Sequence, residues 1–287
     1  MTKRRVFLGG LVASTTAFLS PPLLQADTSS KSVIAIGGAI TEIVFALGQG
    51  HRLLARDSTS TYPQATQELP DVGYMRQLSA EGVLSYAPSI IIAAEGAGPP
   101  EVIEILRAAS VTLVDVPDGY DADAIIEKIR IVGAALGVPE RAKALADETR
   151  AALETSMTSA VRTQEAQKRV LFILSTQGGR ILASGKNTGA DSIIQMAGAQ
   201  NAVQSFQGYK PLSDEAVSAA APDVVLMMDH NGNHATNDAA LFELPALSIT
   251  PAAQSRSVIR MNGLLLLGFG PRTADAVVSL NRSLYPA

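Results

Sequence analysis

The chain contains no cysteine and no tryptophan, and only three of its 287 residues are histidine. The lack of cysteine excludes disulfides, thiolate metal sites and cysteine nucleophiles. His51, His230 and His234 leave little room for a histidine-rich metal site. Charge is also sparse: 17% of the residues are charged, the net charge is −4 and no long basic run occurs. This composition argues against a nucleic-acid-binding protein.

Residues 1–26 have the features of a signal peptide. Lys3, Arg4 and Arg5 form a positive region, an apolar stretch at residues 6–19 follows, and Ala26 ends a segment suited to cleavage. The adjacent arginines fit a twin-arginine signal and a general secretory signal equally well. The apolar stretch is short for a membrane span, which needs about 20 residues. We therefore expect cleavage to release a protein without a membrane anchor into the periplasm.

Short apolar runs alternate with helical patterns along the rest of the chain. Residues 33–36, 90–94, 170–174 and 224–228 are apolar runs of strand length, and a turn or helix signal follows each of them. Such alternation is typical of an α/β fold with parallel sheets.

Residues 139–162 form a long helical pattern without internal glycine or proline, and Pro139 suits a first helical turn. A continuous helix of about 24 residues would be ~36 Å long. Its central position predicts a rigid connection between two lobes. The domain prediction is a signal peptide at 1–26, an N-terminal lobe at 27–138, a bridging helix at 139–165 and a C-terminal lobe at 166–287.

The two halves of the chain share a sequence repeat. Residues 78–95 and 212–229 align without gaps, with coinciding Leu, Ser, Glu, Val, Ala and Pro positions. A Gly-Tyr pair precedes each copy and contributes Tyr74 in the first half and Tyr209 in the second. The repeat predicts two similar lobes with a ligand cleft between them.

The segment of residues 73–76 offers the chemistry of a haem site. If the segment is extended, Tyr74 and Arg76 lie on the same side. A phenolate oxygen suits ferric iron, and tyrosine is a known axial ligand of haem. A guanidinium would help a phenol with an ordinary pKa near ~10 to ionise, or would pair with a haem propionate. Tyr209 and Lys210 form a similar pair, although both tyrosines also fit half-buried aromatic residues with hydrogen-bonded hydroxyls.

Two further groups are weaker candidates. Arg56 follows an expected strand, where α/β lobes often bind ligands, but it also fits a surface ion pair with Asp57. His230 and His234 could bind a metal or act as a second haem ligand, or they could belong to a polar surface loop.

Glu81 and Glu215 occupy matching positions of the repeat, two residues after Ser79 and Ser213. Serine N-caps and acidic residues in a first helical turn are favourable without any further function. The matched placement of one carboxylate on each lobe also suits docking on a two-fold transporter with basic sockets.

No catalytic motif is recognisable. The chain has no Gly-x-Ser-x-Gly elbow, no Walker loop and no His-Glu-x-x-His helix. We therefore expect a binding protein rather than an enzyme.

Several segments resemble the periplasmic hemin-binding proteins of bacterial haem ABC importers, within the helix-bridged superfamily that also binds cobalamin and siderophores. The most specific similarity lies in residues 72–82. Other similar segments are residues 37–43, 94–100, 208–213 and 264–272.

The resemblance implies two Rossmann-like α/β lobes joined by one long helix, with haem b as the transported ligand in the cleft between them. It implies a monomer that delivers haem to an inner-membrane ABC permease dimer and its ATPase, with docking through Glu81 and Glu215. Tyr74 would be the axial iron ligand. The other expected pocket residues are Met75, Arg76, Tyr209, Lys210 and Arg56.

One region departs from the pattern of some members of this family. Residues 175–177 read Ser-Thr-Gln where those members have a histidine ligand. A second axial ligand, and with it the binding of two haems, therefore stays open. The alternatives are a siderophore- or cobalamin-binding protein of the same fold, a haem-degrading enzyme, and an adaptor without a small ligand.

Overall fold

The computed structural model describes residues 32–229 and 238–286. The predicted signal peptide and both His230 and His234 lie outside these residues, as does Ala287. No helix in the described ranges is both long and apolar enough to cross a membrane.

The N-terminal lobe is built on a parallel sheet with the strand order β2-β1-β3-β4. Every residue of β1 is buried, because helices cover both faces of the sheet. Alternate side chains of β1 therefore join different cores: Val33 and Ala35 enter one cluster, and Ile34 and Ile36 enter another. The strands are β1 (Val33–Ile36), β2 (Leu53–Arg56), β3 (Ile90–Ala94) and β4 (Thr112–Val116). The helices are α1 (Gly38–Ala46), α2 (Ala80–Leu84), α3 (Pro100–Ala108) and α4 (Ala122–Ala135).

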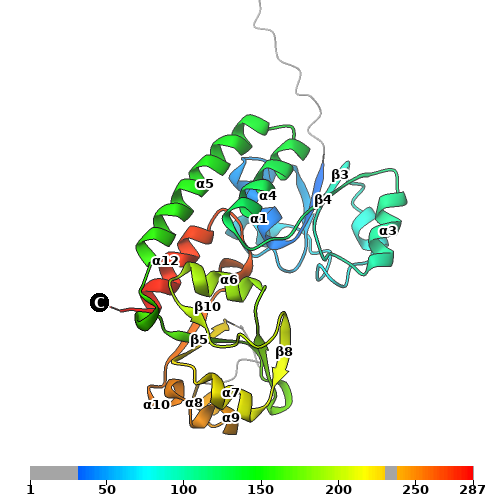
Figure 1. Ribbon diagram of the computed structural model, residues 1–287. Helices are drawn as coiled ribbons and strands as arrows, with labels where there is room; N and C mark the ends of the chain where they lie inside the picture. Colours follow the sequence, from blue (N-terminus) through cyan, green and yellow to red (C-terminus); the bar gives the residue numbers. More distant parts are fainter. Residues whose placement is uncertain (1–31, 230–237, 287) are drawn as a thin grey trace, which may run out of the picture. The chain divides into compact units, whose positions relative to one another are not determined.

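A single long helix, α5 (Pro139–Ala160, 22 residues), follows α4. Its buried residues recur every three or four positions and form one face of the helix. This face contacts α4 of the N-terminal lobe and α12 (Thr273–Leu284) of the C-terminal lobe (Figure 1). The predicted long helix is therefore present, but it ends two residues before Arg162, where Val161 leaves the helical backbone conformation (φ −54°, ψ 132°).

The C-terminal lobe contains a mixed sheet with the order β10-β9-β5-β6-β8, and β7 also pairs with β5. Strands β9, β10 and β7 run parallel to their neighbours, whereas β6 is antiparallel to both β5 and β8. The strands are β5 (Arg169–Ser175), β6 (Ile181–Ser184), β7 (Gln200–Asn201), β8 (Tyr209–Leu212), β9 (Val224–Met228) and β10 (Val258–Met261). The remaining helices are α6 (Gly189–Met196), α7 (Asp214–Ala220), α8 (Asp238–Phe242), α9 (Pro245–Ser248), α10 (Pro251–Gln254) and α11 (Gly263–Leu267).

The α/β fold with two lobes is thus confirmed, but the expectation of parallel sheets is wrong for part of the second lobe. A turn at Gly178 and Gly179, both with positive φ, reverses the chain after β5 and makes β6 antiparallel. Tyr209, the tyrosine of the second Gly-Tyr pair, begins the edge strand β8.

Candidate functional site

The loop that contains Tyr74 is held in place by backbone hydrogen bonds on both sides. The N–H of Gly73 donates to the Asp71 carboxylate (2.8 Å), and its carbonyl accepts from the N–H of Ser58 (2.9 Å). On the other side, the carbonyl of Met75 accepts from the N–H of Gly98 (2.9 Å). Gly73 has a φ of 97°, which strongly favours glycine. The loop therefore presents Tyr74 from a defined backbone position.

Tyr74 and Arg76 are both exposed, Tyr74 to 41%. Neither the Tyr74 hydroxyl nor the Arg76 guanidinium forms a hydrogen bond or ion pair with any residue in the described ranges. Both groups are therefore free to bind a ligand.

Tyr209 enters the site from the C-terminal lobe. It pairs with Ser184 of β6, and its ring lies edge-on to Phe172, with 6.3 Å between the ring centroids. Burial raises the pKa of Tyr209, while hydrogen bonding to Thr188 and to the backbone of Ala190 partly offsets this effect. The phenol is therefore neutral at physiological pH.

Sequence reasoning missed a third tyrosine of the site, Tyr120, which follows the carboxyl end of β4. Its hydroxyl donates to Asp118 (3.2 Å), and its ring packs against Phe269, with 5.2 Å between the centroids. Burial and, secondly, the Asp118 carboxylate raise the pKa of Tyr120 to about 12. A signal was present in the sequence, because Gly119-Tyr120 is another Gly-Tyr pair at the end of a strand, where α/β lobes bind ligands.

The electrostatic contacts bring these groups from the two lobes together. Besides burial and hydrogen bonding, two charges affect the pKa of Tyr209: Arg76 lowers it and Asp118 raises it. The pKa of Tyr120 responds to the same two charges and also to Tyr209. The pKa shifts thus couple Arg76, Asp118 and both phenols, and we call these four residues and Tyr74, which lies two residues before Arg76 in the chain, the tyrosine site.

The other predicted pocket residues have contacts of their own. Arg56 donates to Asp71 (2.8 Å), and Asp71 also accepts from the N–H of Gly73. Arg56 therefore helps to hold the Tyr74 loop in place through Asp71. Asp57 is not its ion-pair partner, because the Asp57 carboxylate is buried and accepts from the N–H of Gly37. Met75 packs against the core of the N-terminal lobe. Lys210 places its ammonium 5.5 Å from the centroid of the Phe206 ring.

Glu81 and Glu215 are exposed and lie in the first turns of α2 and α7. Ser79 and Ser213 accept hydrogen bonds from the N–H groups of Gly82 and Ala216, each at 3.3 Å, so both predicted N-caps are confirmed. Hydrogen bonds from its own N–H and from the Ser213 hydroxyl lower the pKa of Glu215. That carboxylate is therefore charged at neutral pH.

An ion pair links α1 to the segment that precedes α12. The Arg272 guanidinium donates to Glu42 of α1 (2.7 Å), and the N–H of Arg272 donates to the same carboxylate (3.2 Å). The guanidinium also lies 3.5 Å from the centroid of the Tyr62 ring. This pair fixes the segment before α12 on the N-terminal lobe.

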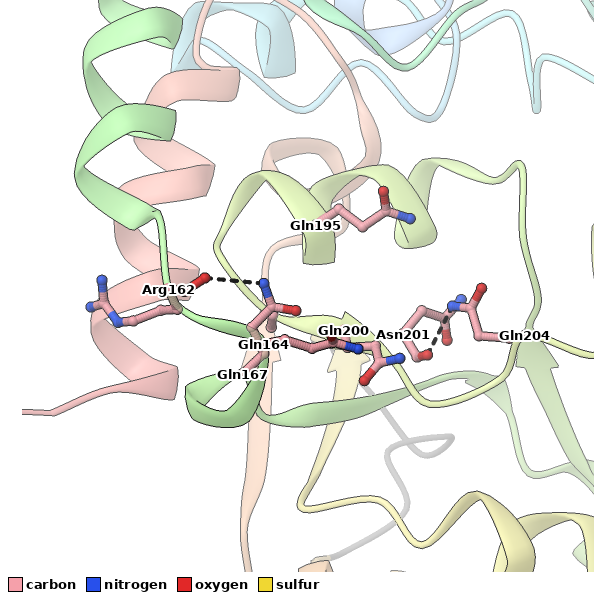
Figure 2. Close-up of a pocket in the computed structure, with 8 residues that line it drawn as sticks. Arg162, Gln164, Gln167, Gln195, Gln200, Asn201 and Gln204 are labelled. Atoms are coloured by element: carbon pink, nitrogen blue, oxygen red, sulfur yellow. Dashed lines mark hydrogen bonds between the residues drawn. The ribbon is translucent and has the colours of Figure 1, made fainter.

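A separate hollow of about 630 Å³ lies beside the end of α5, next to β7. Its lining is mostly amide side chains, and Figure 2 shows Gln195 on α6 on one side and Gln164, Gln167 and Gln200 on the other. The amide of Gln167 donates to the carbonyl of Arg162 (3.4 Å). Haem needs an apolar slot, so this polar hollow is a poor match for it.

Comparison with known proteins identifies the relatives of this chain. A family model described as periplasmic binding protein matches residues 33–263. The periplasmic haem-binding protein BhuT, solved in complex with two haems, is 41% identical with a TM-score of 0.83, and the match covers 88% of this chain and 97% of BhuT. The periplasmic haem-binding protein RhuT from Roseiflexus sp. RS-1, solved in its apo form, is 40% identical with a TM-score of 0.85, and the match covers 89% of this chain and 98% of RhuT. A vitamin B12-binding protein of Vibrio cholerae is 27% identical over 271 residues, which cover 93% of this chain and 94% of the relative.

Proposed function

We propose that this chain, which belongs to the periplasmic binding protein family, binds haem and delivers it to an ABC permease of the inner membrane. Proteins of this family bind substrates and are not enzymes, so a catalytic role is excluded. The two solved relatives at 41% and 40% identity are haem-binding proteins, which supports haem over other ligands of the family.

The main observation in favour of haem is the anchored loop that presents Tyr74 and Arg76 without partners among the described residues. A ferric ion needs an anionic or basic axial donor, and tyrosinate is such a donor. Of the three phenols at the tyrosine site, those of Tyr120 and Tyr209 have raised pKa values. The hydroxyl of Tyr120 already donates to Asp118, whereas that of Tyr74 has no hydrogen-bond partner among the described residues, and this difference supports Tyr74 as the iron ligand.

Arg76 has two uses in this proposal. Its positive charge favours the phenolate form of a nearby tyrosine, and its planar set of donors matches a haem propionate. Tyr209 would contact the ligand from the C-terminal lobe, with Lys210 beside it. Arg56 and Met75 would contribute mainly by supporting the Tyr74 loop.

Glu81 and Glu215 are proposed to dock on the permease. Each is exposed in the first turn of a short helix, at matching positions of the two lobes. Two carboxylates on a monomeric binding protein would fit basic sockets on the two halves of a permease dimer whose ATPase drives transport. The bound form of the cargo is proposed to be haem b.

The relative that binds vitamin B12 defines the competing ligand class. The mature protein should therefore be titrated separately with hemin, cyanocobalamin and a ferric siderophore, and followed by absorbance. We expect saturable binding of hemin alone, and the endpoint gives the number of haems bound. Saturation by cyanocobalamin or the siderophore, with no response to hemin, would overturn the haem proposal and leave the family assignment intact.

A further inference from the structure

The tyrosine site contains a carboxylate that does not favour the binding of an anionic ligand. Asp118 follows β4, its side chain is 43% exposed, and its charge reaches both Tyr120 and Tyr209. A ligand with carboxylate groups would be repelled by this charge at short range. Some other group must therefore compensate for Asp118 if the site binds such a ligand.

Lys128 of α4 is the group that lies against Asp118. Its ammonium is 3.6 Å from the Asp118 carboxylate and donates to the backbone carbonyl of Phe269 (3.3 Å). The Lys128 side chain is only 5% exposed, so its charge is buried and does not face solvent. Burial lowers the pKa of Lys128, and the Asp118 carboxylate opposes that change.

Charged groups of both signs lie at the tyrosine site. Asp118 and Arg76 are the charged groups that act on the phenols of Tyr120 and Tyr209. The Glu95 carboxylate accepts from the N–H of Asp118 (2.9 Å) and is a second, exposed negative group beside it. Because Lys128 pairs with Asp118, one of these two carboxylates is compensated, and the exposed charge of Arg76 stays available to a ligand anion.

We propose that Lys128 is a specificity-determining residue of the tyrosine site: by neutralising Asp118 from below, it allows the site to accept a porphyrin that carries free carboxylates. This inference rests on the proposed function. It assigns the selection of ligand charge to a residue that is buried under the site and that sequence reasoning did not single out. Lys128 acts through Asp118 and does not itself touch the ligand.

The test compares hemin, which has two free propionates, with hemin dimethyl ester, in which both are neutral. In Lys128→Met the stem of the side chain is replaced by one of similar length without the charge. We expect hemin affinity to fall at least about 10-fold. One uncompensated unit charge ~4 Å away would change the affinity about 1,000-fold at an effective dielectric constant of about 20, and the 43% exposure of Asp118 reduces that effect. The affinity for the dimethyl ester should not change.

The double variant Lys128→Met/Asp118→Asn removes both charges and should restore the hemin affinity to within a few-fold of the wild type. A structural role of Lys128, through its bond to Phe269, would weaken both ligands alike, and the double variant would not recover. That result would overturn the inference, as would an unchanged hemin affinity in Lys128→Met. Failure of the wild-type protein to bind hemin would instead refute the proposed function, so the two failures are distinguishable.

Discussion

The ion pair between Glu42 and Arg272 gives a sharp prediction for stability. The Glu42 side chain is 6% exposed and the Arg272 side chain 24% exposed, and the carboxylate accepts two hydrogen bonds from Arg272. Glu42→Gln leaves the guanidinium partly buried without a counter-charge. Breaking a buried pair in this way typically costs about 3–5 kcal/mol. We expect about 3 kcal/mol of lost unfolding free energy, at the low end of that range, because water reaches part of Arg272 and glutamine keeps an amide oxygen.

Urea unfolding followed by far-ultraviolet circular dichroism measures this loss. The matched control is Lys143→Gln, which breaks an exposed pair with Asp147 that is just as short, at 2.6 Å. Exposed pairs contribute little, so the control should leave the midpoint unchanged. If both variants shift the midpoint equally, the burial of the Glu42–Arg272 pair does not determine its contribution and the reasoning is wrong.

Three further predictions concern the tyrosine site and the docking residues. Because the pKa of Tyr120 is raised to about 12 from an ordinary value near ~10, its stabilising contribution is complete below about pH 10 and is lost as the pH rises toward 12; phenolate absorbance should show one late-titrating tyrosine that Tyr120→Phe removes. Gly73→Ala should cost about 1–2 kcal/mol in urea unfolding, because its φ is 97°, and should weaken hemin binding. Glu81→Ala and Glu215→Ala should keep hemin affinity but slow haem uptake by permease vesicles, whereas Glu148→Ala on α5 should not; equal uptake by all three would refute docking.

Much of the fold follows from local sequence pattern. The strand at Val33–Ile36 and the helix that begins at Pro139 are recognisable because complete burial and helical periodicity leave direct marks in the sequence. Strand β8 escaped prediction, since Pro211 within Tyr209–Leu212 argues against a strand. The structure resolves this conflict by placing β8 at the sheet edge, where a missing N–H interrupts no outer ladder.

The site was predictable only in part, for a different reason. Tyr74 and Tyr209 stand out because a repeat marks both of them. Tyr120 is marked only by its Gly-Tyr pair, and Asp118 and Lys128 by nothing comparable. The importance of all three depends on the packing of the β4 end against Phe269. Contacts of this kind, between residues more than a hundred positions apart, leave no periodic signal in a single sequence.

The most direct test of the account is a hemin titration of the wild-type protein beside Tyr74→Phe, with Tyr209→Phe as the matched control. We expect the wild type and the control to give the absorbance bands of ferric haem bound by tyrosinate, and Tyr74→Phe to lack them, because phenylalanine keeps the ring but removes the donor oxygen. If Tyr74→Phe shows the same spectrum and affinity as the wild type, Tyr74 is not the iron ligand and the central claim is contradicted.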